Sequence, residues 1–192
     1  MNEKVKVLLV ENDDDYAFLI SKIITDDERL EYLGHVTNRA AGVEMSCKTN
    51  PDIVVMDLNL SGSELDGIEA AKEIRLKTGA KVIFLTSFEQ PDIMIEACKR
   101  AFASAYIFKS QCRGLADVIY QVATSATPQE GFIKKLLLNE LSPAEISIFY
   151  NILNGDSDMH SSQKTIANQK TNIFKKMAVK NSNELIHLFK NW

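Results

Sequence analysis

Cysteine is scarce in this chain of 192 residues, which contains only Cys47, Cys98 and Cys112. The number is odd, and no two of them have the Cys-x-x-Cys spacing. Both facts argue against a disulfide framework and against a cysteine-based metal site. We therefore interpret the three as free thiols of a protein in the reducing cytoplasm.

Long apolar runs are also absent from the sequence. No stretch approaches the roughly 18 apolar residues that a membrane-spanning helix needs. The N-terminal MNEKVKVLLVEN starts directly with a strand pattern and lacks the cleavage region of a signal peptide. We therefore expect no membrane partner and a cytoplasmic location. Hydrophobic residues make up 45% and charged residues 25% of the chain, an ordinary balance for a globular protein.

Charge is distributed unevenly along the chain. The formal net charge of −4 is the sum of −6 over residues 1–125 and +2 over residues 126–192. An acidic first part and a mildly basic second part indicate two modules with different partners. The basic excess is too small to indicate nucleic-acid binding by itself.

Apolar segments of strand length alternate with amphipathic segments of helical length in the first 120 residues. The expected strands are 5–10, 30–36, 52–57, 81–87 and 105–109. The expected helices are 16–25, 40–47, 67–77, 92–100 and 115–124. This alternation predicts an α/β fold with a doubly wound, five-stranded parallel sheet.

A different pattern follows this first module. Thr, Ser, Pro and Gly cluster in TSATPQEG (124–131), so we expect one domain over 1–124, a linker over 125–138 and a second domain over 139–192. FIKKLLLNE (132–140), which follows this cluster, is expected to form a small helix. Helices are expected at 141–155, 164–177 and 183–190, the first with a capping box formed by Ser142 and Glu145. The second module is therefore predicted to be small and all-α.

Polar side chains follow four of the expected strands at the points where the strands end. They are Glu11, Asn12, Asp57, Asn59, Thr86 and Lys109. Ligands of parallel sheets bind at the carboxyl ends of the strands, so these side chains belong at one site. Two carboxylates and an amide oxygen suit Mg²⁺, and a hydroxyl and an ammonium would face an anion bound to that ion.

Each of these residues has an ordinary explanation when taken alone. Glu11 would cap the next helix, Lys109 would be a solvated lysine, and Thr86 would be a β-branched strand residue. Asp57, however, ends an apolar strand, where an unpaired carboxylate is costly. The ordered set therefore favours a functional site.

The segments VLLVEN, PDIVVMDLNLSGSELDG, VIFLTS and AYIFK resemble the receiver domain of bacterial response regulators, over about residues 3–124. The resemblance implies a flavodoxin-like fold and phosphorylation of Asp57 by a sensor histidine kinase. It implies that Glu11, Asn12, Asp57 and the backbone carbonyl of Asn59 arrange Mg²⁺.

The resemblance also assigns roles to three further residues. Lys109 would pair with the phosphoryl group, Thr86 would donate a hydrogen bond to it, and Tyr106 would rotate in concert. Such a domain catalyses only its own phosphotransfer and dephosphorylation. One departure concerns the metal: receivers usually have Asp where this chain has Asn12, so we expect weaker Mg²⁺ binding. The register argues against compensation by Asp13.

The segments LSPAEISIFYNILNG and KTIANQKTNIFKKMAVKNSNELIHL resemble the LuxR-type (NarL/FixJ-like) helix-turn-helix output domain, over about residues 139–190. The resemblance implies a DNA-recognition helix at 164–177 and a final helix that often serves dimerisation. The family has a scaffold helix before the recognition helix, and this chain is shorter there by about six residues. DSDMHSSQ (156–163) offers no apolar stripe, so the helix-turn-helix is expected to be degenerate.

Two interpretations of the second module stay open. In the first, its polar residues contact DNA, with Asn and Gln pairing with bases and Lys with phosphates. These residues are Lys164, Asn168, Gln169, Lys170, Lys175 and Lys176. In the second, the lysines are the solvated face of a core helix whose buried side is Ile166, Ile173, Phe174 and Met177.

The sequence therefore predicts a response regulator of a two-component system. Phosphorylation of Asp57 would promote a homodimer and alter DNA binding, and so regulate transcription. The alternative is an atypical regulator that has lost DNA binding and acts through protein contacts or dimerisation. A hydrolase that uses the strand-end carboxylates is a poor third interpretation, because the chain shows no further pair of nucleophile and base.

Overall fold

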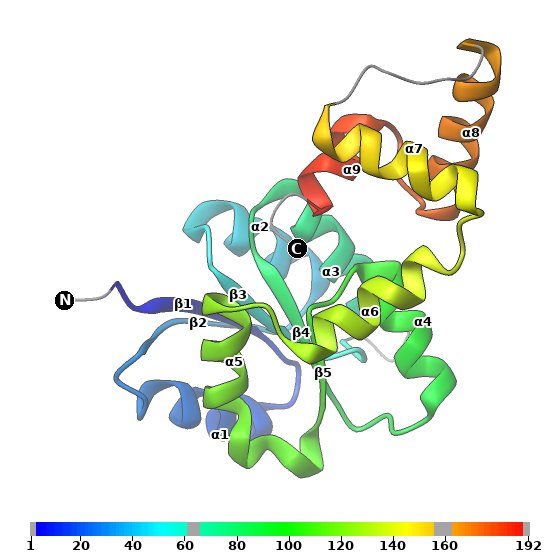
Figure 1. The fold of residues 1–192 in the computed structure, drawn as a ribbon. Helices are drawn as coiled ribbons and strands as arrows, with labels where there is room; N and C mark the ends of the chain where they lie inside the picture. The colour runs from blue at the N-terminus through cyan, green and yellow to red at the C-terminus, as the bar shows by residue number, and fades with distance from the viewer. Residues whose placement is uncertain (1–2, 61–65, 156–162, 190–192) are drawn as a thin grey trace. The chain divides into compact units, whose positions relative to one another are not determined.

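The computed structural model of the protein describes residues 3–60, 66–155 and 163–189 (Figure 1). The chain divides into two compact units, Met1–Gly131 and Phe132–Trp192. Within the described ranges, no helix is both long and apolar enough to span a bilayer. The two units are described separately below.

The first unit is built on a five-stranded parallel sheet. Its strands are β1 (Val5–Val10), β2 (Leu30–Val36), β3 (Ile53–Met56), β4 (Lys81–Thr86) and β5 (Ala105–Phe108). They pair in the order β2-β1-β3-β4-β5, with every pair parallel. This order confirms the expected doubly wound parallel sheet. Apart from the half-buried Lys6 and Lys81, the residues of β1, β3 and β4 are buried, as expected for strands covered on both faces.

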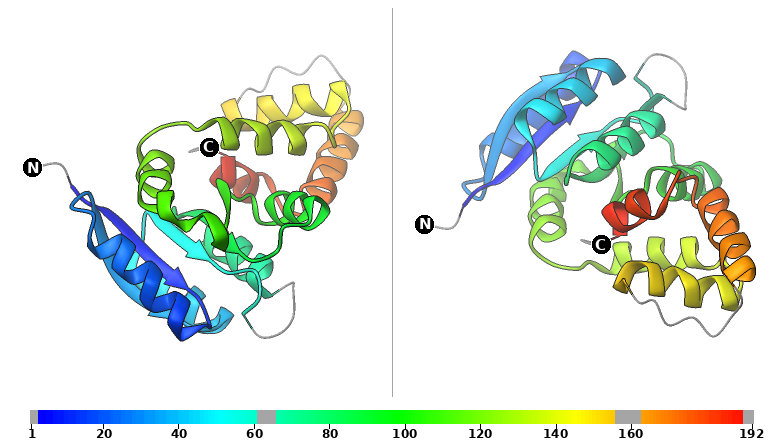
Figure 2. Two further views of the ribbon diagram at one scale, coloured as in Figure 1. Left: turned by 90° about the horizontal axis from the view of Figure 1, so that it is seen from below. Right: turned by 90° about the horizontal axis from the view of Figure 1, so that it is seen from above.

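Helices cover both faces of this sheet (Figure 2). They are α1 (Asp14–Thr25), α2 (Arg39–Thr49), α3 (Asp66–Lys77), α4 (Pro91–Ala101) and α5 (Leu115–Thr124). On one face α1 and α5 pack together, with Ile20 and Ile119 in a core shared with Val7 and Leu9 of β1. On the other face α3 packs between α2 and α4. A 3₁₀ helix, η1 (Lys109–Gly114), joins β5 to α5 and was not predicted.

The segment expected as a linker, 125–138, contains the helix α6 (Pro128–Leu138), which starts before the small helix expected at 132–140. Proline suits the first helical turn, where its missing N–H needs no partner. Thr127 and Glu130 form a reciprocal cap: each side chain accepts the backbone N–H of the other residue at 3.2 Å. The division between the two units falls within this helix, after Gly131.

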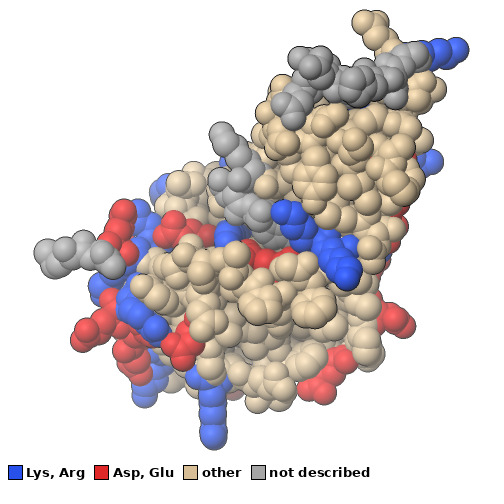
Figure 3. Space-filling model, viewed as in Figure 1, with Lys and Arg blue, Asp and Glu red and all other residues tan. Residues whose placement is uncertain are grey.

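The second unit contains α7 (Pro143–Asn154), α8 (Gln163–Lys176) and α9 (Ser182–Phe189), and α7 packs on the other two. The capping box of Ser142 is present, and α7 ends at Gly155, whose φ of +73° favours glycine. The rings of Phe149 and Phe189 meet edge to face at 5.0 Å in its core. Lys and Arg side chains lie at the edge of this unit in Figure 3, and the rest of its visible face is largely uncharged.

The question of a scaffold helix concerns residues 156–162, which lie outside the described part of the chain. Of the stretch from Asp156 to Gln163, only Gln163 is described, and it is the first residue of α8.

Candidate functional site

Strand register places Glu11 and Asp57 next to each other at the carboxyl edge of the sheet. Val10 pairs with Met56 in neighbouring parallel strands, and the backbone N–H of Asp57 donates to the carbonyl of Val10 at 2.9 Å. The residues that follow each strand therefore lie side by side. Both carboxylates are buried, with Glu11 1% and Asp57 6% exposed. Two buried carboxylates in this position need a cation or hydrogen-bond donors to be stable.

Lys109 provides that cation. Its Nζ lies 2.7 Å from Oε2 of Glu11 and 3.1 Å from Oδ2 of Asp57. Burial raises the pKa of Glu11, in part offset by the contact with Lys109. Burial lowers the pKa of Lys109, but the two carboxylates outweigh this effect and raise it above its ordinary value. Three sequence-predicted site residues thus form one charged cluster.

The ring of Tyr16 lies against the same ammonium, with Lys109 Nζ 4.5 Å from the ring centroid, within the range of a cation–π interaction. Tyr16 is held there by the first turn of α1. The carboxylate of Asp13 caps this turn and accepts the backbone N–H groups of Asp15 and Tyr16, at 3.0 and 3.1 Å. Asp13 thus serves as the helix cap. Sequence reasoning missed Tyr16, because an aromatic residue in an amphipathic helix gives no signal of its partner.

Thr86 and Tyr106 are joined through the backbone of Phe88. The Thr86 hydroxyl accepts the N–H of Phe88 at 3.3 Å, and the Tyr106 hydroxyl donates to the carbonyl of Phe88 at 2.8 Å. Both side chains are buried, and burial raises the pKa of Tyr106. The two sequence-predicted switch residues are therefore linked by one peptide segment at the end of β4.

The oxygen ligands expected for a metal lie at the same edge. Glu11 and Asp57 supply two carboxylates, Asn59 is half-buried two residues after Asp57, and Asn12 is exposed. Among the described residues there is no group of three His, Cys, Asp or Glu side chains placed to hold a metal ion. Two carboxylates, with amide and carbonyl oxygens and waters, still form the hard-oxygen set that suits Mg²⁺. The residues present therefore fit this ion, with one carboxylate fewer than an Asp at position 12 would give.

Gly67 allows the helix after the site to approach Asp57 closely. Its backbone N–H donates to the carbonyl of Leu58 at 3.1 Å. A Cβ at this position would lie 2.3 Å from the carbonyl oxygen of Asp57 and 2.6 Å from Cα of Leu58. Since backbone atoms cannot move aside as a flexible side chain can, residue 67 must be glycine for α3 to start where it does.

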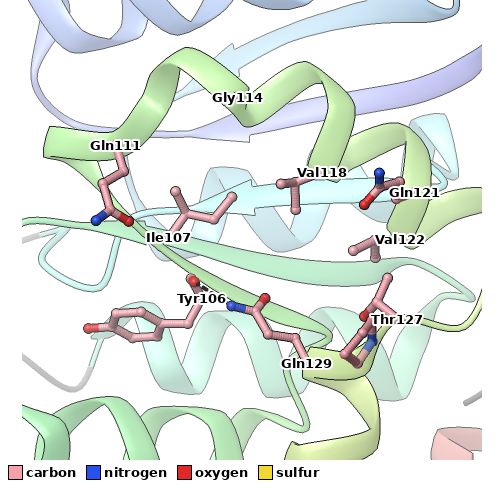
Figure 4. Close-up of a pocket in the computed structure, with 10 residues that line it drawn as sticks. Tyr106, Ile107, Gln111, Gly114, Val118, Gln121, Val122, Thr127 and Gln129 are labelled. Atoms are coloured by element: carbon pink, nitrogen blue, oxygen red, sulfur yellow. Dashed lines mark hydrogen bonds between the residues drawn. The ribbon is translucent and has the colours of Figure 1, made fainter.

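The backbone of Tyr106 also contacts the first turn of α6 (Figure 4). Its carbonyl accepts a hydrogen bond from Nε2 of Gln129 at 3.2 Å, whereas its ring points away from Val118 and Val122 of α5. The next residue, Glu130, forms an ion pair of 3.0 Å with Lys81 of β4, and both side chains are largely buried. Together these contacts fix the start of α6 on the strands that carry Thr86 and Tyr106.

The six residues of α8 predicted to contact DNA do not share one face. Lys164, Asn168 and Lys175 are exposed and lie, by helical periodicity, opposite the buried Ile173 and Met177. They form the set that we call the exposed face of α8. Basic side chains at the edge of this unit are visible in Figure 3.

The other three predicted residues differ from this set. Gln169 and Lys170 are half-buried. Nζ of Lys176 lies 2.6 Å from Oε2 of the buried Glu145 in α7. Lys176 thus contributes to packing between helices. The second interpretation expected four apolar residues of this helix to be buried. Ile173 and Met177 are buried, whereas Ile166 and Phe174 are half-buried.

Comparison with known proteins identifies the first unit. The family described as "Response regulator receiver domain" matches residues 7–119, more than half of the chain. The transcriptional regulatory protein LiaR of Bacillus subtilis is 26% identical over 138 residues, which cover 71% of this chain and 64% of LiaR. The transcriptional regulatory protein DesR of the same organism is 24% identical over 191 residues, which cover 95% of this chain and 94% of DesR.

Similarity to solved structures extends over both units. The RcsB response regulator of Salmonella typhimurium has a TM-score of 0.58 and 21% sequence identity, and the match covers 97% of each chain. At this identity the comparison shows the fold. It shows a parallel-sheet unit followed by a helical C-terminal unit, in the same order as here.

Proposed function

Because the chain belongs to the response regulator receiver family and carries a LuxR-type helical output domain, we propose that it is a cytoplasmic response regulator of a two-component phosphorelay. A sensor histidine kinase would phosphorylate Asp57, and the output domain would respond. We propose that the receiver spans residues 1–124 and the output domain 139–192, with α6 in the segment between them. Its chemistry would be limited to its own phosphotransfer and dephosphorylation.

The observation that carries this proposal is the cluster of Asp57, Glu11 and Lys109 at the carboxyl edge of the sheet. Asp57 presents a carboxylate oxygen that can attack phosphorus, and Lys109 lies 3.1 Å from it with a charge that can pair with the transferred phosphoryl group. Glu11, 2.7 Å from the same ammonium, keeps Lys109 at the site before transfer. The phosphoryl group would thus arrive beside a cation that is already in place.

We propose that Mg²⁺ is held by the carboxylates of Glu11 and Asp57, the amide oxygen of Asn12 and the backbone carbonyl of Asn59, with waters. When bound, the ion would neutralise the charge that spreads over the phosphoryl oxygens during transfer. Asn12 contributes no full charge, so we expect a weaker affinity than a third carboxylate would give.

The signal would leave the site through Thr86 and Tyr106. A phosphoryl group on Asp57 would draw the Thr86 hydroxyl into a hydrogen bond and release the N–H of Phe88. The carbonyl of Phe88 holds the Tyr106 hydroxyl, and the carbonyl of Tyr106 holds Gln129 of α6. A shift in this segment would therefore reach the helix that leads to the output domain.

We propose that the output domain regulates transcription by binding DNA as a homodimer. The exposed face of α8 offers Lys164 and Lys175 to phosphates and Asn168 to a base. DesR is named a transcriptional regulatory protein, and RcsB has been solved as a complex with DNA. Both likenesses extend over nearly the whole chain and support the proposal.

A second function is favoured by the short connection between α7 and α8. Only residues 155–162 separate the end of α7 from the start of α8. A recognition helix needs a neighbouring scaffold helix to set its angle in the groove. In this alternative, the output domain no longer binds DNA and acts through dimerisation or contacts with another protein.

The experiment compares the full chain with and without a small phosphodonor and Mg²⁺, in wild type and Asp57→Ala. Sedimentation gives the dimer fraction, and titration of duplex DNA gives the affinity. We expect the donor to change the dimer fraction and the DNA affinity in the wild type only. A change in the dimer fraction without measurable DNA binding would select the alternative. Equal responses of wild type and Asp57→Ala would reject both.

A further inference from the structure

Lys109 occupies the oxygen atoms that a metal ion would need. Its ammonium contacts Oε2 of Glu11 at 2.7 Å and Oδ2 of Asp57 at 3.1 Å. These are the two carboxylates of the proposed Mg²⁺ site. An ammonium and a divalent ion cannot share the same oxygen atoms at full strength, because both are attracted by the same negative charge. Lys109 in this position is therefore an internal competitor of the metal.

The ring of Tyr16 makes a third contact with the Lys109 ammonium, in addition to the two carboxylates. The ring centroid lies 4.5 Å from Nζ of Lys109. The negative face of an aromatic ring stabilises a cation, most strongly where water is excluded, and Lys109 is only 7% exposed. The cap by Asp13 fixes the first turn of α1 and thus the place of the ring. The contact favours the position of Lys109 between the two carboxylates.

The small net charge of this site increases the effect that the contact between Tyr16 and Lys109 should have on Mg²⁺ affinity. With Asn12 in place of an acidic residue, Glu11 and Asp57 are the two carboxylates of the described residues at this site, and Lys109 neutralises one of their charges. The net charge left to attract Mg²⁺ is then small. Interactions that hold the lysine in place should consequently have a measurable effect on metal affinity.

We propose that Tyr16 is a positioning residue that holds the Lys109 ammonium on Glu11 and Asp57 in the unphosphorylated protein, where it competes with Mg²⁺ for their oxygens. This inference rests on one part of the proposed function, namely that the carboxylates of Glu11 and Asp57 bind Mg²⁺. Tyr16 would thereby set the Mg²⁺ concentration at which the receiver becomes competent for phosphotransfer.

The test is a calorimetric titration of the full-length, metal-free protein with Mg²⁺, without a phosphodonor. Replacing the ring in Tyr16→Leu and Tyr16→Met should lower the Kd for Mg²⁺ by about threefold to tenfold, the factor that corresponds to a cation–π contact. Tyr16→Phe keeps the ring face and should retain the wild-type Kd. Phe18→Leu is the matched control, since it removes a neighbouring aromatic ring of α1 that is 72% exposed.

A metal-free measurement checks the contact itself. Ring current should shift the ε-methylene protons of Lys109 upfield in the NMR spectra of wild type and Tyr16→Phe, and the shift should vanish in Tyr16→Leu. The proposal is overturned if that shift is absent in the wild type. It is also overturned if Tyr16→Leu and Tyr16→Met bind Mg²⁺ no more tightly than the wild type, or if Tyr16→Phe behaves as they do.

Failure of the proposed function would give a different result. Phosphorylation of Asp57 is measured separately, with a phosphodonor. Unchanged Mg²⁺ affinity in Tyr16→Leu, together with normal labelling of Asp57, would reject the role of Tyr16 alone. Tighter Mg²⁺ binding in Tyr16→Leu, together with no labelling of wild-type Asp57, would support the role of Tyr16 and reject the signalling function.

Discussion

The ammonium of Lys176 in α8 lies 2.6 Å from the carboxylate of Glu145 in α7. The same carboxylate oxygen accepts the backbone N–H of Ser142 at 2.8 Å, so Glu145 closes the capping box of α7 and joins α7 to α8. Sequence reasoning placed Lys176 among the candidates for DNA contact, and the ion pair with Glu145 gives it a structural role inside the helical unit. The helix α8 therefore carries one lysine that pairs with α7, Lys176, and exposed lysines such as Lys164 and Lys175.

We expect Lys176→Ala to destabilise the helical unit. Without this lysine, the buried carboxylate of Glu145 keeps the backbone N–H of Ser142 as a hydrogen-bond donor but loses its cation. The expected loss is about 1 kcal/mol in the free energy of unfolding, the typical net value of one hydrogen bond to a charged group at a partly exposed site. Chemical denaturation followed by circular dichroism measures it. Lys175→Ala, one residue away and exposed, should leave the free energy unchanged. Equal effects of the two substitutions would contradict this assignment.

The same pair predicts a dependence of stability on pH. The hydrogen bond from Lys176, followed by that from the Ser142 backbone, lowers the pKa of Glu145 below its ordinary value of 4.5. A carboxylate whose pKa is depressed by folding stabilises the folded state above the unfolded pKa, and this contribution is lost as the pH falls through the folded pKa. The difference in free energy of unfolding between wild type and Glu145→Gln should therefore be largest near neutral pH.

Denaturation curves at a series of pH values from 7 down to 3 would measure this difference. The difference in free energy of unfolding between wild type and Glu145→Gln should begin to shrink below pH 4.5. The free energy of unfolding of Lys176→Ala should change less with pH over this range than that of the wild type. A difference between wild type and Glu145→Gln that grows as the pH falls would contradict the sign of the pKa shift.

The exposed face of α8 predicts which lysines contribute to DNA binding. Lys164→Ala and Lys175→Ala should each weaken binding to duplex DNA and reduce the slope of log affinity against log salt by about one. Fluorescence anisotropy at several salt concentrations measures both quantities. Lys22→Ala, which removes an exposed lysine of α1, is the matched charge control and should change neither. Wild-type protein that shows no salt-dependent binding at low salt would favour the alternative function without DNA.

Gly67 predicts a steric effect on the site. Gly67→Ala would place a Cβ 2.3 Å from the carbonyl oxygen of Asp57, so the start of α3 and the segment after β3 must move apart. We expect a loss of about 2 kcal/mol in stability, in the range of overpacking substitutions, and slower phosphorylation. Gly114→Ala is the control, because a Cβ there would meet nothing within 4 Å. A Gly67→Ala protein with wild-type stability and labelling rate would show that this close approach is unimportant.

Much of the first unit could be predicted because its strands are short apolar runs with polar residues at their ends. Parallel pairing then places those ends at one edge, and so Glu11, Asp57 and Lys109 could be grouped without a structure. The start of α6 was missed because Pro128 and Gly131 were taken as linker residues, so the expected helix began only at Phe132. A proline at the first position and the Thr127–Glu130 capping pair were the available signals for a helix.

The contacts that could not be predicted are those between side chains distant in the sequence. Tyr16 meets Lys109 only after α1 has packed on the sheet, and no local pattern in either segment names the other. Lys176 and Glu145 are likewise 31 residues apart, and their pairing depends on how α7 packs on α8. Local periodicity identified the buried side of α8 but not which lysine on its polar side has an internal partner.

The central claim is that Asp57 accepts the phosphoryl group. The most direct measurement incubates the full chain with a small phosphodonor and Mg²⁺ and counts the phosphoryl groups gained by intact-mass spectrometry. Wild-type protein should gain a single phosphoryl group, located on the peptide that contains Asp57, and Asp57→Ala should gain none. Equal labelling of wild type and Asp57→Ala, or no labelling of the wild type at saturating Mg²⁺, would contradict the account.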